Sequence, residues 1–155
     1  MNTSPFENVK DQIGFCGIWC GSCAVGNGSL QDLTHKYEEV IDSYGLEQWA
    51  PNDFDFKGFR KGLKSIQAVV SCSGCLKGGG RGDCEIRACA QKKKIADCSV
   101  CDDPAACQHL DLLQTMRSGA QKANLFVKTD NVDRQELLKK WLSDLKNTWP
   151  SRLLF

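Results

Sequence analysis

The 155-residue sequence has no long apolar run: no stretch reaches the roughly 18 unbroken apolar residues that a membrane helix needs. Its first residues, MNTSPFENVKDQ, also lack the basic and then apolar pattern of a secretion signal. An excess of one charge is missing too, because 20 basic and 19 acidic side chains leave a formal charge of +1. We therefore expect a cytoplasmic protein with no membrane partner, and we consider nucleic acid an unlikely one.

Cysteine is the residue in excess. A block of three and a block of seven are separated by 48 residues without cysteine: Cys16, Cys20 and Cys23, then Cys72, Cys75, Cys84, Cys89, Cys98, Cys101 and Cys107. Ten cysteines could form five disulfides in a secreted protein, but three pairs have the C-x2-C spacing, which points both sulfurs toward one spot. That geometry suits a metal ion. All ten are therefore candidate metal ligands, with disulfides and free or redox thiols as the alternatives.

The apolar pattern is helical almost throughout. Amphipathic helices are predicted over 30–44, from residue 53 or 55 to 70, over 85–94, from Asp103–Pro104 through 116, and over 133–149. Only residues 123–129 offer a short strand. We predict a single domain over 1–155 of the mainly α class: a helical frame with an irregular, Cys-rich metal-binding insert over 72–107, which has little apolar core of its own.

The spacing within the insert is that of a structural zinc site. Cys72-x2-Cys75 and Cys98-x2-Cys101 are 22 residues apart, as in a two-knuckle site. The glycines of GGGRG permit positive-φ turns that aim N–H groups at sulfur. The motif could also be interpreted as a phosphate-binding loop, but it lacks the Lys-Ser/Thr that ends such a loop. Ten thiols fill two four-sulfur sites and leave two over, whereas adding His35 and His109 would fill three. We expect about two zinc ions, with the partition of ligands open.

Cys16-x3-Cys20-x2-Cys23 has a second interpretation. Radical S-adenosylmethionine enzymes hold a four-iron cluster with this spacing, but this chain lacks the alternating strands and helices of their barrel. An iron–sulfur cluster for electron transfer needs only the thiolates and remains the alternative. No residues form a recognisable catalytic set, because only Cys107 and His109 stand close and their side chains diverge on a helix. The balance is against an enzyme.

The charges are unevenly distributed along the chain. Residues 1–56 carry a net −7, residues 57–94 a net +8, and residues 95–155 are balanced. The basic middle could be a surface for anions or nucleic acid. We favour compensation instead, since a zinc ion held by four thiolates carries a net charge of −2.

Several motifs together resemble the domain-of-unknown-function family 3795, short Cys-rich proteins of bacteria and archaea. They are CGIWCGSC, SCSGCLKGGGRGDCEIRACAQKK, CSVCDDPAACQHL and KKWLSDLKNTW. The resemblance implies zinc binding by the cysteines of these motifs. Family members often have proline just before the last cysteine, where this chain has Ala106. From residues and resemblance together we expect an uncharacterised zinc-binding protein with structural thiolate sites, acting as an interaction module for a protein partner; the alternative is an iron–sulfur or thiol-redox electron-transfer protein.

Overall fold

The computed structural model describes residues 3–155. The α-helices are α1 (Pro5–Val9), α2 (Ala24–Asn27), α3 (Ser29–Ser43), α4 (Phe56–Gln67), α5 (Glu85–Lys93), α6 (Leu110–Lys122) and α7 (Arg134–Leu145). Short 3₁₀ turns are η1 (Cys20–Ser22), η2 (Leu46–Gln48), η3 (Cys75–Lys77), η4 (Cys98–Val100) and η5 (Ser151–Leu154). Across these residues there is no strand, only the isolated bridges Ile13–Trp19 and Ile18–Val127. The mainly α class is confirmed, and within 3–155 no helix combines the length and apolar character needed to cross a bilayer.

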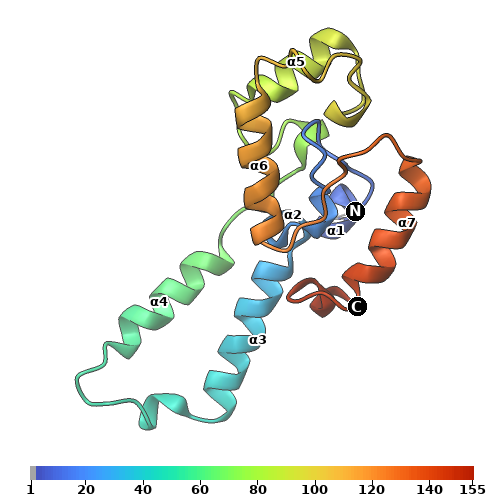
Figure 1. The fold of residues 1–155 in the computed structure, drawn as a ribbon. Helices are drawn as coiled ribbons and strands as arrows, with labels where there is room; N and C mark the ends of the chain where they lie inside the picture. The colour runs from blue at the N-terminus through green and yellow to red at the C-terminus, as the bar shows by residue number, and fades with distance from the viewer. Residues whose placement is uncertain (1–2) are drawn as a thin grey trace.

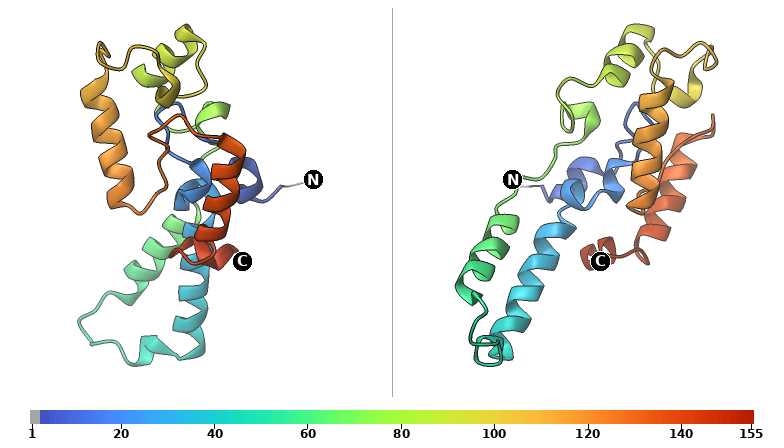
Figure 2. Two further views of the ribbon diagram at one scale, coloured as in Figure 1. Left: turned by 45° about the vertical axis from the view of Figure 1, so that its right-hand side comes forward. Right: turned by 60° about the vertical axis from the view of Figure 1, so that its left-hand side comes forward.

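The molecule is elongated. Helices α3 and α4 form a hairpin that projects from one end, while α5 and α6 lie at the other (Figure 1). The two further views agree, and both place α7 beside the N-terminal segment (Figure 2). We call residues 29–67 the arm. The 48 residues that separate the two cysteine blocks are thus the arm and its connections.

The main core joins the two ends of the chain. Trp19 stacks on Trp141 of α7 with ring centroids 5.8 Å apart, and Phe126 lies against both rings. Ile13, Leu138 and Leu145 are the other buried members of this cluster, against which Phe126 is partly buried. Helix α7 begins as the sequence predicts, because the Glu136 N–H donates to the Asp133 carboxylate at 2.8 Å. The apolar stripe of α7 therefore fixes the N-terminal cysteine segment in place.

The arm also follows its sequence signals. Gly45 ends the first helix in the left-handed region at φ +58°, where glycine is free of a Cβ clash. Asp55 caps α4, accepting a hydrogen bond from the Gly58 N–H at 2.9 Å. Between the two helices Ile41 and Leu63 are buried. Arg60 of α4 pairs with Glu38 and Asp42 of α3, so buried apolar side chains and two ion pairs hold the hairpin together.

Three boundary predictions are wrong. The helix expected from Asp103–Pro104 begins only at Leu110, because Asp103 accepts from the Ala106 N–H at 3.3 Å and so caps a single turn that leads to Cys107. Val70 lies beyond the end of α4 and Trp149 beyond the end of α7, and both are exposed. In each case the chain leaves the helix to reach its next contact: the Cys72 N–H bonds to the Val25 carbonyl.

Candidate metal centre

The fold divides the ten cysteines into two sets that line different cavities. The first set lines a cavity of about 250 Å³ and consists of Cys16, Cys20, Cys23, Cys72, Cys75 and Cys84. The second set lines a cavity of about 670 Å³ and consists of Cys89, Cys98, Cys101 and Cys107. All ten are partly buried and none forms a disulfide. The spacing pairs Cys72/Cys75 with Cys98/Cys101, whereas the fold separates these pairs because α5 intervenes.

The sulfurs surround the cavities without converging. Within residues 3–155, no three cysteine, histidine or acidic side chains have the geometry of a formed metal-binding group. The structure therefore shows which cysteines are neighbours and does not show a coordination sphere.

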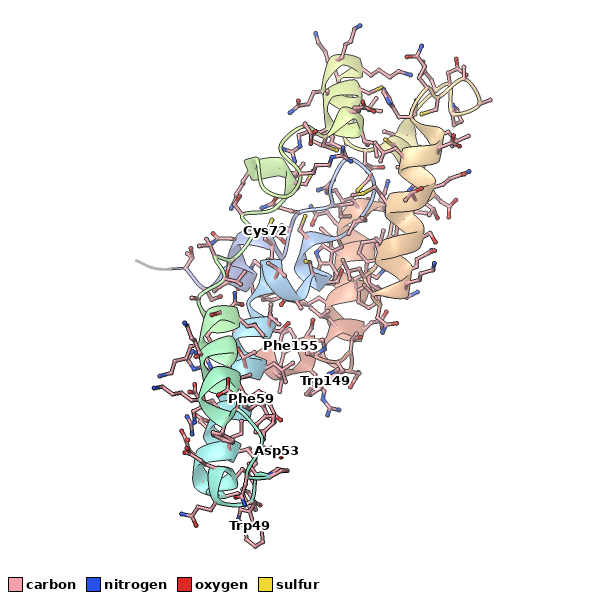
Figure 3. The ribbon with its side chains drawn as sticks, turned by 90° about the vertical axis from the view of Figure 1, so that its left-hand side faces the viewer. Trp49, Asp53, Phe59, Cys72, Trp149 and Phe155 are labelled. Atoms are coloured by element: carbon pink, nitrogen blue, oxygen red, sulfur yellow. The ribbon has the colours of Figure 1, made fainter. Side chains whose placement is uncertain are left out.

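The first set contains cysteines that precede the arm and cysteines that follow it. The Cys75 N–H points at the Cys20 sulfur, 3.4 Å away. Gln12, which is buried, holds the same junction with its side-chain amide: it donates to the Ser73 carbonyl at 2.9 Å and accepts from the Leu76 N–H at 3.0 Å. Figure 3 shows Cys72 where the arm meets the rest of the molecule. Cysteines before and after the arm are thereby brought into one cavity.

Glycines make room for these sulfurs. A Cβ on Gly79 would lie 2.8 Å from the Cys72 sulfur, and one on Gly14 would lie 3.2 Å from the Cys75 Cβ. Gly78 and Gly80 have φ values of +81° and +73°, so the glycine-rich loop does turn through the left-handed region. The positive-φ turns predicted for the GGG motif are present, whereas the main-chain N–H group that the described residues direct at a sulfur is that of Cys75, which precedes the motif.

The thiols of the first set affect one another. Burial raises the pKa of Cys20 to about 11, although the Cys75 N–H acts against this shift; nearby Cys75, Cys72 and Cys16 raise it further. Burial also raises the pKa of Cys16, with Cys75 and Cys84 adding to the effect. Thiolates here would repel each other in a poorly solvated space, and a bound cation would remove that repulsion.

The second set is assembled from three short segments. Helix α5 provides Cys89, η4 provides Cys98, the residue that follows η4 is Cys101, and the turn after Pro104 provides Cys107. Lys93 of α5 donates from Nζ to the Cys101 sulfur at 3.3 Å, and this thiol raises the pKa of Lys93. Four cysteines around one cavity match the number of thiolates in a closed structural zinc site.

The two sets adjoin through Cys16 and Cys98. The Cys98 N–H donates to the Phe15 carbonyl at 2.8 Å, and Arg117 of α6 donates from Nε to the Cys16 carbonyl at 2.8 Å. Burial raises the pKa of Cys98 to about 11, while the Arg117 guanidinium acts in the opposite direction. Arg117 is therefore a cation shared by both sets.

One of the two histidines lies beside a cysteine-lined cavity. His109 lies beside the second cavity, but its Nδ1 is 3.3 Å from the Glu85 carboxylate. His35 is exposed on α3, in the arm.

Gln12, Arg87 and Arg117 are site residues that the sequence analysis did not identify. Arg87 lines the first cavity and donates to the carbonyls of Gly79 and Arg81, fixing the glycine-rich loop. Each bonds to main-chain atoms six or more residues away, so no local motif marks it. Among these three residues, Gln12 is recognisable in the structure because its polar side chain is buried.

The donor chemistry fits a thiophilic metal. Every cysteine is reduced. Six sulfurs line the first cavity, and four sulfurs with the His109 imidazole line the second. Cations lie beside both cavities: Arg81 and Arg87 at the first, Lys92, Lys93 and Arg117 at the second. Sulfur-rich sites select zinc or iron–sulfur clusters over magnesium or calcium. The basic stretch 57–94 is split by the fold, since its first four cations lie on α4 in the arm, away from the thiols.

A protein-family model described as "Protein of unknown function (DUF3795)" matches residues 12–112. Comparisons with curated proteins and with solved structures gave no match. The matched range contains all ten cysteines and the whole arm.

Proposed function

The chain belongs to the DUF3795 family of proteins of unknown function, and within it we propose a zinc-binding protein whose thiolate sites are structural and hold an interaction module in shape. One observation carries the proposal: ten reduced cysteines divide into a set of six and a set of four around two cavities. Four thiolates satisfy a tetrahedral zinc ion, so each set has enough donors for one ion.

The proposed role of the metal is to couple binding to folding. Residues 72–84 have no periodic apolar pattern, and hydrogen bonds from Gln12, from Lys77 and from the Cys72 and Cys75 N–H groups link them to the N-terminal segment. Zinc bound by the first set would link Cys16 and Cys20 to Cys72 and Cys75 and so close the base of the arm. Structural zinc sites of this kind contribute on the order of 10 kcal/mol. The fixed arm is then available to a protein partner.

Substitution of one cysteine in each set tests the proposal. We expect the wild-type protein, purified without air, to contain two zinc ions per chain by elemental analysis. Cys101→Ser should lose one ion from the second set and Cys75→Ser one from the first, because three thiolates hold zinc much more weakly than four. Each variant is the other's control. Loss of both ions from either variant, or loss of neither, would contradict two independent sites.

An iron–sulfur cluster in the first set is the second candidate. It is favoured by the presence of six thiols where one zinc ion needs four, and by the N–H directed at the Cys20 sulfur. In that case the anaerobic protein should be brown, with iron and sulfide in equal amounts, and Cys75→Ser should abolish the colour. A colourless protein with zinc in both sets excludes this candidate.

A further inference from the structure

His109 lies in the turn before α6 and not on the helix itself. The sequence predicts a helix through Cys107 and His109, and the side chains of residues two apart on a helix diverge. Helix α6 begins only at Leu110, so that argument does not hold for this pair. Both side chains line the second cavity, together with the other three cysteines of the second set. The cavity therefore offers five donor side chains to a metal ion, one more than a tetrahedral site uses.

The imidazole of His109 has one ring nitrogen beside a carboxylate. His109 is the N-cap residue of α6, but its side chain makes no capping hydrogen bond. Its Nδ1 lies 3.3 Å from the Glu85 carboxylate of α5. A carboxylate in this position favours the neutral imidazole that carries its proton on Nδ1. The lone pair of Nε2 is then free to bind a metal ion.

This pairing of carboxylate and imidazole is common at zinc sites. A histidine that binds zinc through one ring nitrogen usually donates the N–H of the other to a carboxylate, which fixes the orientation of the ring. Glu85 and His109 come from different elements and meet beside the second cavity. The Glu85 side chain is 66% exposed, and ion pairs so exposed contribute little to stability, so stabilisation alone does not account for this pair.

Three cysteines of the second set lie in short turns near one another. Cys98 begins η4 and Cys101 follows it, while Cys107 lies in a turn closed by its N–H and the Pro104 carbonyl. Cys107 and Cys101 both raise the pKa of the Cys98 thiol, so the three sulfurs are neighbours. Cys89 instead lies in the middle of α5, where the main-chain hydrogen bonds of the helix hold it in place. Turns can close around an ion more readily than a helix can, so Cys89 is the surplus donor.

We propose that His109 is the fourth ligand of the second metal site, binding through Nε2, and that Glu85 orients its imidazole. The other three ligands are Cys98, Cys101 and Cys107, while Cys89 remains a free thiol beside the ion. This inference rests on the proposed zinc site and names its ligands. Three thiolates and one imidazole form a usual structural zinc site, with one negative charge fewer than four thiolates.

Substitutions within the second cavity test the assignment. The full-length protein, purified without air and loaded with zinc, is dialysed against a weak chelator and analysed for metal. His109→Ala should retain one zinc ion where wild type retains two, because only three thiolates remain for the second ion. Cys89→Ser removes a thiol from the same cavity and is the matched control, which should retain both ions. His35→Ala, in the arm, should also retain both.

Glu85→Gln tests the orienting role. Zinc should still bind to the second site but roughly tenfold more weakly, as is typical when the carboxylate behind a ligating histidine is removed. Competition with a chromophoric chelator measures the affinity. Glu47→Gln, an exposed position in the arm, is the control and should match wild type.

Nitrogen-15 NMR of the imidazoles provides a readout that does not depend on stability. The chain has two histidines, so a spectrum of His35→Ala assigns both. Zinc should shift the Nε2 resonance of His109 and leave that of His35 unchanged. In zinc-free Glu85→Gln, the His109 ring should shift toward the form protonated on Nε2, which a purely structural role of Glu85 would not cause.

Three results would each overturn the assignment of His109: retention of both ions by His109→Ala, an Nε2 resonance that zinc leaves unchanged, or loss of an ion from Cys89→Ser. In these cases Cys101→Ser would still lose one ion, so the second zinc site would stand with four thiolates as its ligands. A wild type that binds no zinc would instead overturn the proposed function and this inference with it.

Discussion

At the scale of single residues, glycines govern access to the cysteines. A Cβ on Gly79 would lie 2.7 Å from the Gly74 main-chain nitrogen and 2.8 Å from the Cys72 sulfur, so any side chain there must shift the loop that carries Cys72, whereas a methyl group added at Gly82 would meet nothing within 4 Å. The two glycines belong to the same glycine-rich motif, but only Gly79 lies where a side chain would not fit.

Gly79→Ala should weaken metal binding by the first set alone. The new methyl group would lie 2.8 Å from the Cys72 sulfur and also close to Ser73, so the loop must shift. Titration with a chromophoric zinc chelator should show one ion held at least tenfold more weakly and the other unchanged. Gly82→Ala is the control and should match wild type. Equal affinities in the two alanine variants would show that Cys72 takes no part in binding.

At the scale of elements, a buried ion pair connects η4 to the segment before α7. Lys128 contacts Asp97 at 3.1 Å, both side chains are almost fully buried, and Ser99 bonds to both. Burial alone would raise the pKa of Asp97, but the hydrogen bonds from Ser99 and the pairing with Lys128 outweigh it and lower this pKa. The second cysteine set is thereby tied to the core of Trp19 and Trp141.

Asp97→Asn should destabilise the protein by about 3 kcal/mol at neutral pH, because it leaves the Lys128 ammonium buried without its counter-charge. The lowered pKa means that the ionised carboxylate stabilises the fold above its ordinary pKa of about 4, and that this stabilisation disappears as pH falls through the lower folded value. Chemical unfolding as a function of pH should therefore show the variant and wild type converging in acid. The exposed Asp130→Asn is the control. A constant difference down to the lowest pH would rule out ionisation of Asp97 as the cause.

At the scale of the whole molecule, the first cysteine set lies where the arm joins the rest. The chain leaves this point at α2, runs out and back through α3 and α4, and returns at Cys72. A cross-link here closes a loop of about 50 residues, and closing a loop of that length removes several kcal/mol of chain entropy from the unfolded state. We expect the arm's orientation to depend on this closure.

Removal of metal should loosen the arm's base and the cysteine-rich region but leave the Trp19–Trp141 core folded. We expect chelation of the reduced protein to lower the Tm by more than about 10 °C and to speed amide hydrogen exchange over residues 72–107, with α7 still protected. Added zinc should reverse the change, and added magnesium should not. If the chelated, reduced chain keeps its Tm, the cysteines do not stabilise this fold through metal.

Much of this architecture is already determined by the sequence. The helices of the arm, α5 and α7 follow from local signals: apolar spacing, a capping aspartate and a terminating glycine, all of which act within a few residues. The same signals fail at Asp103–Pro104, because a capping pattern gives only one turn when the chain must then reach Cys107.

The sequence by itself determined a mainly helical, cysteine-rich chain in which thiols are the only candidates for cross-links. Only the tertiary structure decided that Cys72 and Cys75 join the N-terminal cysteines, that Cys98 and Cys101 join Cys89 and Cys107, and that His109 lies beside the latter set. The physical reason is the distance along the chain over which each kind of interaction acts. Helix signals act between neighbouring residues, whereas the grouping of sulfurs depends on how α7 fixes the N-terminal segment and on contacts such as those of Gln12, which join residues more than 60 positions apart.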